Sequence, residues 1–308
     1  MALVTGPARD SAFGALSRPS GAFAMVAIDQ RESLRTMLRQ TSDTAASDLD
    51  IVAFKLAVLR RLSAYASAFL LDRDYALGPA LAAGALRPGF GLIVAADRLI
   101  QEPGGPVDRT ELDGSVFELA VAAGATALKL LVPWDPAGGA SHRTELVAEF
   151  VDRCRAAGVL SLVEGVVRLH PGADEAWLGT EGILEAAREL VRHDPDLYKA
   201  QVPTLGNGSS DDIVAWSRRM TAIVGRPWVV LSSGVPPREF PRAVEAACRG
   251  GASGFLAGRA IWTGALPESQ RVDQLEGVAA PLLVRLGAIV DKHARPWRLA
   301  IGASSAVG

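Results

Sequence analysis

Eight short apolar runs, each followed by a longer stretch with helical periodicity, constrain the fold of this 308-residue chain more than any other feature. The runs are AFAMVAID (22–29), SAFLLD (67–72), FGLIVAAD (90–97), ALKLLVP (127–133), VLSLVEG (159–165), DLYKA (196–200), WVVLSSG (228–234) and SGFLAGR (253–259). Strands that are apolar along their whole length and are each followed by a helix are typical of a parallel sheet whose outer face is covered by helices. Eight such units predict an α/β fold, a closed (β/α)8 TIM barrel.

The repeat of run and helix continues without a linker, so we expect a single barrel domain over residues 1–308. Residues from about 1 to 20 and from 295 to 308 lie outside the repeat and are predicted to be short terminal extensions. A doubly wound open sheet is the alternative. It is disfavoured because the glycine-rich turn expected after its first strand is absent, and the sequence there reads DQRES.

Charge and composition exclude several classes of function. The net charge of −2 provides no basic field that would neutralise a phosphate backbone, so no nucleic-acid partner is expected. No segment approaches 18 uninterrupted apolar residues, and the N-terminus lacks the pattern of a signal peptide. The sequence therefore predicts a cytoplasmic protein with no membrane contact. Two cysteines, Cys154 and Cys248, are too few for a disulfide framework or a thiolate metal site.

Polar residues at the ends of the apolar runs indicate where chemistry would take place, because the active site of a (β/α)8 barrel lies at the C-terminal ends of its strands. The residues at these positions are Asp29, Gln30, Arg31, Asp72, Asp97, Lys129, Glu164, Lys199, Ser232, Ser233, Gly234, Gly258 and Arg259. Taken singly, Asp72 and Asp97 are favoured as caps of the helices that follow them. Taken together, the set would bring two lysines and two carboxylates to one small central space.

Lys129 and Lys199 lie inside apolar strands, although the chain has only four lysines among its 32 basic residues. A lysine that faced the helix layer would be buried without water, so both are predicted to face the barrel axis. There, beside another cation, the neutral amine is favoured and can attack a carbonyl carbon, which an arginine cannot do. The alternative interpretation is a buried ion pair, for instance of Lys129 with Asp29 or Glu164.

The turns after the last two runs predict an anion site. In SSGV and AGRA, the backbone N–H groups of small residues could approach an anion, and Arg259 could pair with its oxygens. The small residues are Ser232, Ser233, Gly234 and Gly258. The loops after strands seven and eight commonly hold a phosphate in barrels of this kind. No HExxH, CxxC or GKS/GKT motif occurs, so we expect neither a metal nor a cofactor.

Stretches spread over residues from about 21 to 292 match a known family. They are GAFAMVAIDQRESLR, YASAFLLD, GLIVAAD, ALKLLV, GVLSLVEGVVR, DLYK, PWVVLSSGV, FPRAV and AGASGFLAGRAIW. On these residues the chain resembles the class I, Schiff-base-forming aldolases of the tagatose-1,6-bisphosphate aldolase group. Within that group it is most similar to the sulfofructosephosphate aldolases of sulfoglycolysis. DQRE, DLYK and LAGRA are the most specific of these matches.

The resemblance implies a metal-independent lyase that acts on a small-molecule sugar phosphate. The reaction would cleave 6-deoxy-6-sulfofructose 1-phosphate into dihydroxyacetone phosphate and 3-sulfolactaldehyde, a step of sulfoquinovose degradation. Lys199 would form the Schiff base and Glu164 would transfer protons. Lys129 would orient hydroxyls and help to keep Lys199 unprotonated, and Asp29 would face the C4 hydroxyl or the iminium nitrogen. The substrate-binding residues would be Gln30, Arg31, Ser232, Ser233, Gly234, Gly258 and Arg259.

Two positions depart from the family pattern. Gly165 stands where the family commonly has a proline after the glutamate, and Gln201 stands where the family has an acidic residue. The alternatives are therefore a tagatose-1,6-bisphosphate or fructose-1,6-bisphosphate aldolase, a non-catalytic barrel that binds a sugar phosphate, and a Glu164-based isomerase without a Schiff base. A homo-oligomer is also expected. The apolar face of residues 277–290 would suit an interface, although it would equally serve to cover the eighth strand.

Overall fold

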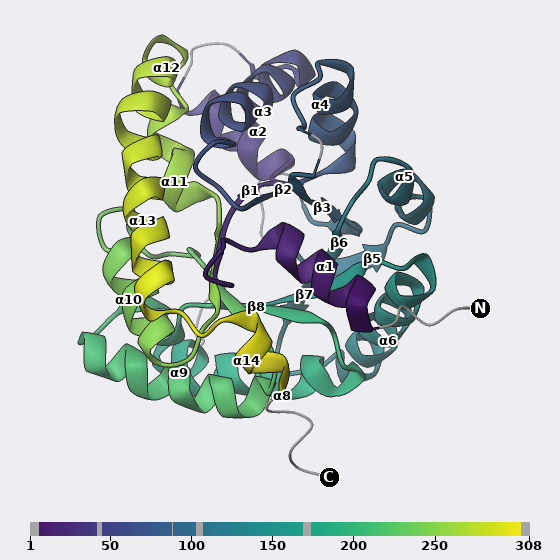
Figure 1. The fold of residues 1–308 in the computed structure, drawn as a ribbon, viewed down its shortest axis with the longest axis vertical. Helices are drawn as coiled ribbons and strands as arrows, with labels where there is room; N and C mark the ends of the chain where they lie inside the picture. Colours follow the sequence, from purple (N-terminus) through teal and green to yellow (C-terminus); the bar gives the residue numbers. More distant parts are fainter. Residues whose placement is uncertain (1–5, 42–44, 88, 103–106, 169–173, 303–308) are drawn as a thin grey trace.

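The computed structural model describes residues 6–41, 45–87, 89–102, 107–168 and 174–302, and it contains a closed barrel of parallel strands (Figure 1). Around the barrel the strands follow the order β1–β10–β9–β8–β7–β6–β3–β2. Their bounds are β1 (Phe23–Ile28), β2 (Ala68–Leu71), β3 (Gly91–Ala95), β6 (Ala127–Trp134), β7 (Leu160–Val167), β8 (Leu197–Gln201), β9 (Trp228–Leu231) and β10 (Gly254–Ala257). Each apolar run of the sequence overlaps one of these strands, so the predicted (β/α)8 TIM barrel is confirmed.

Helices surround the barrel (Figure 1). The longer ones are α2 (Glu32–Arg39), α3 (Asp48–Leu62), α6 (Ala140–Ala157), α8 (Ile183–Leu190), α9 (Ser210–Val224), α10 (Phe240–Arg249) and α13 (Ala280–His293). The shorter ones are α4 (Gly78–Ala82), α5 (Val116–Ala122), α7 (Glu175–Trp177), α11 (Arg259–Trp262) and α12 (Arg271–Gln274). The starts of α3 and α9 are fixed by capping boxes, in which Ser47 and Ser209 each accept a bond from a backbone N–H. Within the described ranges, no helix is both long enough and apolar enough to span a bilayer.

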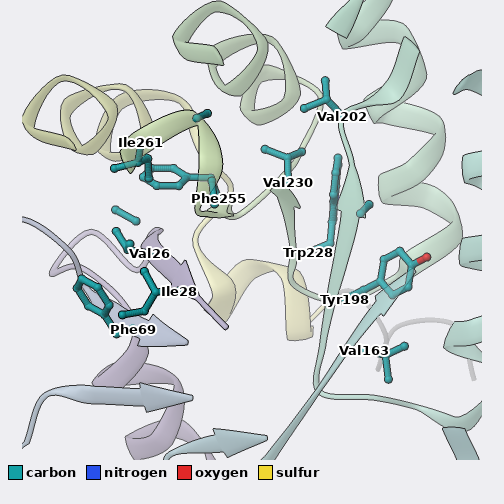
Figure 2. Packing of buried hydrophobic residues seen from close by; sticks show 14 of the residues in the cluster. Val26, Ile28, Phe69, Val163, Tyr198, Val202, Trp228, Val230, Phe255 and Ile261 are labelled. Carbon is teal, nitrogen blue, oxygen red and sulfur yellow. The ribbon is translucent and has the colours of Figure 1, made fainter. Parts of the chain in front are cut away.

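Side chains alternate across each strand, which divides the buried residues into two layers. The outward side chains pack against the helices and form the main core, and Figure 2 shows part of this layer, with Val163, Tyr198 and Trp228 on three neighbouring strands. The inward side chains form a second cluster inside the barrel, which includes Leu162 and Leu197. Because both faces of the sheet are buried, the strands have no polar face and read as continuous apolar runs.

The N-terminal end of the barrel is closed by α1 (Gly6–Leu16) and α14 (Trp297–Gly302), which belong to the two terminal segments outside the repeat. Phe13, Leu16 and Trp297 are buried in the same cluster as the inward side chains of the strands. The rings of Phe13 and Trp297 stack with centroids 5.1 Å apart, and Figure 1 shows α1 crossing this end of the barrel. Residues 1–5 and 303–308 of the predicted extensions lie outside the described residues.

One further sheet interrupts the repeat after β3. The strands β4 (Asp97–Ile100) and β5 (Arg109–Leu112) form an antiparallel pair, with Asp97 opposite Leu112 and Arg98 opposite Glu111. The sequence pattern does not predict this hairpin. Its strands are short, charged and only partly buried, so they lack the continuous apolar pattern of the barrel strands.

Candidate active site

A cavity of about 500 Å³ opens at the C-terminal ends of the barrel strands. Predicted site residues from five different strands line it, which are Asp29, Gln30 and Arg31 after β1, Lys129 on β6, Glu164 on β7, Ser233 after β9 and Arg259 after β10. Residues that are distant in the sequence therefore meet at one place. This is the end of a (β/α)8 barrel at which chemistry takes place.

The other predicted residues lie next to this lining rather than in it, and they are Lys199, Ser232, Gly234 and Gly258. Lys199 is only 4% exposed and contacts the cavity residue Glu164. Ser232 and Gly234 belong to the turn that presents Ser233, which is closed by a bond from the N–H of Val235 to the carbonyl of Ser232 (2.8 Å). Gly234 has a φ of 80°, a conformation that favours glycine.

Lys129 and Lys199 both face the barrel axis. Each lies two residues after an inward apolar residue, Ala127 on β6 and Leu197 on β8, so the alternation of the strand places both amines inside. Both amines contact the same atom, Oε2 of Glu164, at 3.5 Å from Lys129 and 2.9 Å from Lys199. The two lysines are thus joined through one carboxylate.

The amine of Lys129 is surrounded by carboxylates. Its Nζ lies 2.6 Å from Oδ2 of Asp29 and 2.7 Å from Oδ2 of Asp97, in addition to the contact with Glu164. Burial alone would lower the pKa of Lys129, but the charges of these three acids outweigh it, and the pKa is raised above its ordinary value. This environment therefore favours the protonated form of Lys129.

Lys199 has a simpler environment. Among the described residues its one ion-pair partner is Glu164, which is its register neighbour on β7. Oε2 of Glu164 forms no aligned hydrogen bond, so the 2.9 Å contact is an ion pair without good hydrogen-bond geometry. Lys199 is therefore paired with one loosely aligned acid, whereas Lys129 is paired with three.

Asp29 is the acid that Lys129 holds most closely. Burial would raise the pKa of Asp29, but the charges of Lys129 and Lys199 outweigh this effect and keep the pKa well below its usual range. Asp29 is therefore ionised at neutral pH. A carboxylate with so low a pKa is a weak base, which suits orientation and charge stabilisation better than proton abstraction.

The prediction that Asp97 caps a helix is wrong, because Asp97 begins the strand β4 and lies behind the cavity wall. Its Oδ2 accepts hydrogen bonds from Nζ of Lys129 (2.7 Å) and from the N–H of Leu131 (3.0 Å). The guanidinium of Arg31 donates to its carbonyl (2.9 Å) and to its Oδ1 (3.2 Å). Asp97 therefore holds in place two residues of the cavity wall, Lys129 and Arg31, from a buried position behind them.

Asp72 does act as a cap, as its position in the sequence suggested, and it also forms an ion pair. Its Oδ2 accepts a hydrogen bond from the N–H of Tyr75 (2.6 Å), and its Oδ1 contacts the amine of Lys55 on α3. Both side chains are completely buried. Burial lowers the pKa of Lys55 and raises that of Asp72. This second buried pair lies outside the cavity lining.

Comparison with known proteins identifies the family. Residues 23–264 match the family described as DeoC/LacD family aldolase, which is most of the chain.

This chain belongs to the DeoC/LacD aldolase family.

Several curated relatives of this chain are tagatose 1,6-diphosphate aldolases. The tagatose 1,6-diphosphate aldolase of Listeria monocytogenes is 28% identical, and the alignment covers 92% of this chain and 91% of the relative. The enzymes of the same name from Lactococcus lactis and Streptococcus agalactiae are 25% and 24% identical, with 92% of this chain and 95% of each relative covered. The chain is therefore related to aldolases, which are lyases of carbohydrate metabolism.

A solved structure shows the same fold. The fructose-bisphosphate aldolase from Plasmodium falciparum, crystallised with TRAP and a small-molecule inhibitor, superposes with a TM-score of 0.72 at 12% sequence identity. The match covers 94% of this chain and 97% of that one. At this identity the comparison supports the barrel fold of this DeoC/LacD aldolase and nothing finer.

The two departures from the family pattern have local explanations in this DeoC/LacD aldolase. A Cβ atom at Gly165 would lie 2.1 Å from the hydroxyl of Tyr198, so Tyr198 occupies the space that any side chain at this position would need. Gln201 is buried, and its Oε1 accepts a hydrogen bond from the N–H of Val167 (2.7 Å). That bond requires an acceptor but no charge, so a neutral amide satisfies it.

The hairpin also contributes cavity residues that the sequence pattern does not predict. Arg98 and Leu99 line the cavity from the first arm, Gln101 lines it just after this arm, and Val107 lines it just before the second arm. The sequence carries one signal that could have revealed them, the two short segments DRLI and RTEL in the long stretch between the third and fourth apolar runs. In the described part of the chain, no group of His, Cys, Asp and Glu side chains has the arrangement of a metal site.

Proposed function

We propose that this DeoC/LacD aldolase is a class I enzyme that cleaves a ketose 1-phosphate through a Schiff base on Lys199, without a metal or other cofactor. One observation carries the proposal, namely that two buried lysines share Glu164 but only Lys129 is also held by Asp29 and Asp97. Lys129 can therefore supply fixed positive charge, while Lys199 is left to react. The family of the chain supports the same type of reaction.

The reaction would begin with attack of the neutral Lys199 amine on the C2 ketone, which forms a carbinolamine. Glu164, at 2.9 Å from the amine, would protonate the departing hydroxyl, and loss of water would give the iminium. Cleavage of the C3–C4 bond then moves its electron pair to the iminium and forms an enamine, while the C4 hydroxyl gives its proton to the Glu164 carboxylate and C4 becomes an aldehyde. Glu164 would return this proton to C3, and attack of water on the resulting iminium would release dihydroxyacetone phosphate and restore the Lys199 amine.

The remaining residues would bind and orient the substrate. Ser233 and Arg259 line the cavity where the sequence predicted the C1 phosphate, and the turns that contain Ser232, Gly234 and Gly258 present them. Arg259 has no ion-pair partner among the described residues, so its charge is available to an anion. The ammonium of Lys129 would orient the C3 and C4 hydroxyls, together with Asp29 and Gln30.

Borohydride trapping tests this proposal directly. Incubation of the protein with dihydroxyacetone phosphate and sodium borohydride in the presence of EDTA is expected to add one reduced adduct, because an iminium is reduced to a stable amine. Peptide mass spectrometry should place the adduct on Lys199, and Lys129 should stay unmodified because it is held as an ammonium by three acids. Absence of a covalent adduct, as expected for a non-catalytic sugar-phosphate-binding barrel, would contradict the proposal.

For the substrate, we propose 6-deoxy-6-sulfofructose 1-phosphate, which would yield dihydroxyacetone phosphate and 3-sulfolactaldehyde. The sequence stretches that resemble sulfofructosephosphate aldolases support it. The charge of the cavity also supports it, because Arg31 is already paired with Asp74 and Asp97 and adds little excess positive charge for a second dianion. Tagatose 1,6-bisphosphate is the second candidate, which the names of the curated relatives favour.

A comparison of specificity constants separates the two substrates. We expect kcat/KM for the sulfosugar to exceed the values for tagatose and fructose 1,6-bisphosphate by about tenfold or more, because one mismatched charge in a binding pocket costs on the order of 1–3 kcal/mol. A bisphosphate kcat/KM equal to or above that of the sulfosugar would contradict this assignment. It would leave the Schiff-base mechanism intact.

The predicted cytoplasmic location and the predicted homo-oligomer stay predictions. Val278 and Val284, on the segment that the sequence suggested for an interface, are more than half exposed, while Leu283 and Leu286 of the same segment are buried. The buried residues cover the barrel, as the alternative interpretation of this segment expected. The exposed valines would be accessible to a second copy of the chain.

A further inference from the structure

The antiparallel hairpin after β3 forms one wall of the cavity. Its first arm contributes Arg98 and Leu99 to the lining, followed by Gln101, and Val107 lies just before the second arm. Two arginines from other loops hold the hairpin at the cavity. Arg31 donates to the carbonyl of Asp97 at 2.9 Å, and Arg168 after β7 forms an ion pair with Asp108 at 3.1 Å.

The order of the strands places this wall opposite the proposed phosphate site. Going around the barrel from β9 in one direction, one meets β8, β7 and β6 before β3, and in the other direction β10, β1 and β2 before β3. The strand that precedes the hairpin is therefore diametrically opposite β9, which precedes Ser233. Lys199, Glu164 and Lys129 lie on β8, β7 and β6, in this order between the two.

A ketose 1-phosphate that follows this order would cross the mouth of the barrel. With the C1 phosphate near Ser233 and C2 at Lys199, the C3 and C4 hydroxyls would lie near Glu164 and Lys129. The C5 and C6 end would then point toward the hairpin. The group at C6 would meet the apolar side chains of Leu99 and Val107 and the guanidinium of Arg98.

Arg98 is the exposed cation of this wall. Its side chain is 68% exposed and pairs with Glu111, which also forms a 2.9 Å ion pair with Arg109. Arg98 can therefore leave Glu111 for a substrate anion while Glu111 keeps Arg109 as a partner. Arg31 has no such freedom, since its side chain is 14% exposed and is bonded to both the carbonyl and the carboxylate of Asp97.

We infer that the hairpin is the specificity wall for the group at C6, and that Arg98 is the residue that selects an anion there. The inference rests on the proposed function and deepens it. A single guanidinium that is released from a shared carboxylate matches one anionic group with one negative charge, such as a sulfonate, better than a phosphate dianion.

The test compares Arg98→Gln with the matched control Arg109→Gln, which removes a cation from the same hairpin and the same carboxylate but not from the cavity lining. We expect Arg98→Gln to lower kcat/KM for 6-deoxy-6-sulfofructose 1-phosphate by about 10- to 100-fold, mainly through KM. With fructose 1-phosphate, which has a neutral hydroxyl at C6, the loss should stay within about threefold. Arg109→Gln should stay within about threefold on both substrates.

Equal losses of Arg98→Gln on the two substrates, or an equal loss of the sulfosugar activity in Arg109→Gln, would overturn the inference. Borohydride trapping of dihydroxyacetone phosphate, a three-carbon ligand that does not reach the hairpin, distinguishes failure of the proposed function from failure of the inference about the hairpin. If the wild-type protein gives no adduct, the proposed function fails. If wild type and Arg98→Gln are trapped at equal rates, but Arg98→Gln changes kcat/KM equally for the charged and the neutral substrate, only the inference about the hairpin fails.

Discussion

Replacement of Lys199 by arginine is expected to reduce aldol cleavage by at least about 10⁴-fold, which is the usual scale for removal of a covalent nucleophile. Arginine keeps the positive charge beside Glu164, so the buried ion pair has a substitute and the fold should persist. The guanidinium, however, stays protonated and cannot attack a ketone. Steady-state kcat of the purified variant measures the loss, and borohydride trapping should give no adduct.

Two comparisons make this result specific. Lys292→Arg changes an exposed lysine of α13 in the same chemical way and should keep full activity. Lys199→Met removes the amine without the bulk of a guanidinium and should be equally inactive, which excludes steric blockage by arginine as the cause. An arginine variant that keeps more than a tenth of the wild-type kcat would contradict the Schiff base on Lys199 and favour chemistry at Glu164 alone.

The barrel could be predicted from the sequence because its strands are buried on both faces. Residues such as Leu162 inside the barrel and Val163 outside it are equally apolar, so each strand gives a continuous signal. The hairpin gives no such signal, since Arg98 and Glu111 face each other across it with their side chains in solvent or at the cavity. A continuous apolar run in the sequence identifies a strand that is buried on both faces. The strands of the hairpin are only partly buried, so they produce no such run.

The candidate site could be predicted only as far as strand ends could be recognised. Lys129 and Lys199 were found because a lysine inside an apolar strand is unusual. Asp97 was not selected, because a cap and an ion-pair partner look alike in sequence and its partners lie 32 and 66 positions away in the chain. Only the closed barrel brings Lys129 and Arg31 to it. The partners of Lys129 were thus predicted in part, as Asp29 and Glu164 but not Asp97.

Replacement of Lys129 by methionine is expected to destabilise the protein and to abolish most of its activity. Methionine has a similar length, but it leaves Asp29, Asp97 and Glu164 buried around an apolar side chain. Breaking a buried ion pair by removing one partner commonly costs about 3–5 kcal/mol, because an uncompensated charge stays buried. Urea unfolding followed by tryptophan fluorescence measures the loss of unfolding free energy, and kcat of the folded fraction should fall by about 100-fold or more.

The destabilisation should depend on pH in a defined direction. In the wild-type protein the pKa of Asp29 is below its unfolded value, so its stabilising contribution is present above the unfolded pKa of about 4 and is lost as the pH falls further. Without Lys129, burial acts on Asp29 with its main counter-charge gone, the pKa rises, and this contribution disappears. The difference in unfolding free energy between wild type and variant should therefore be largest near pH 7.5 and shrink toward pH 4.

Lys55→Met is the matched control for this prediction, because it also removes a completely buried amine from an aspartate, Asp72, but at a position outside the cavity lining. It should lower the unfolding free energy as well, and the folded protein should keep kcat within about threefold of wild type. Loss of stability is then separated from loss of chemistry. If Lys129→Met kept wild-type kcat, or if its destabilisation were the same at pH 4 and pH 7.5, Lys129 would not be the fixed cation that leaves Lys199 free to react.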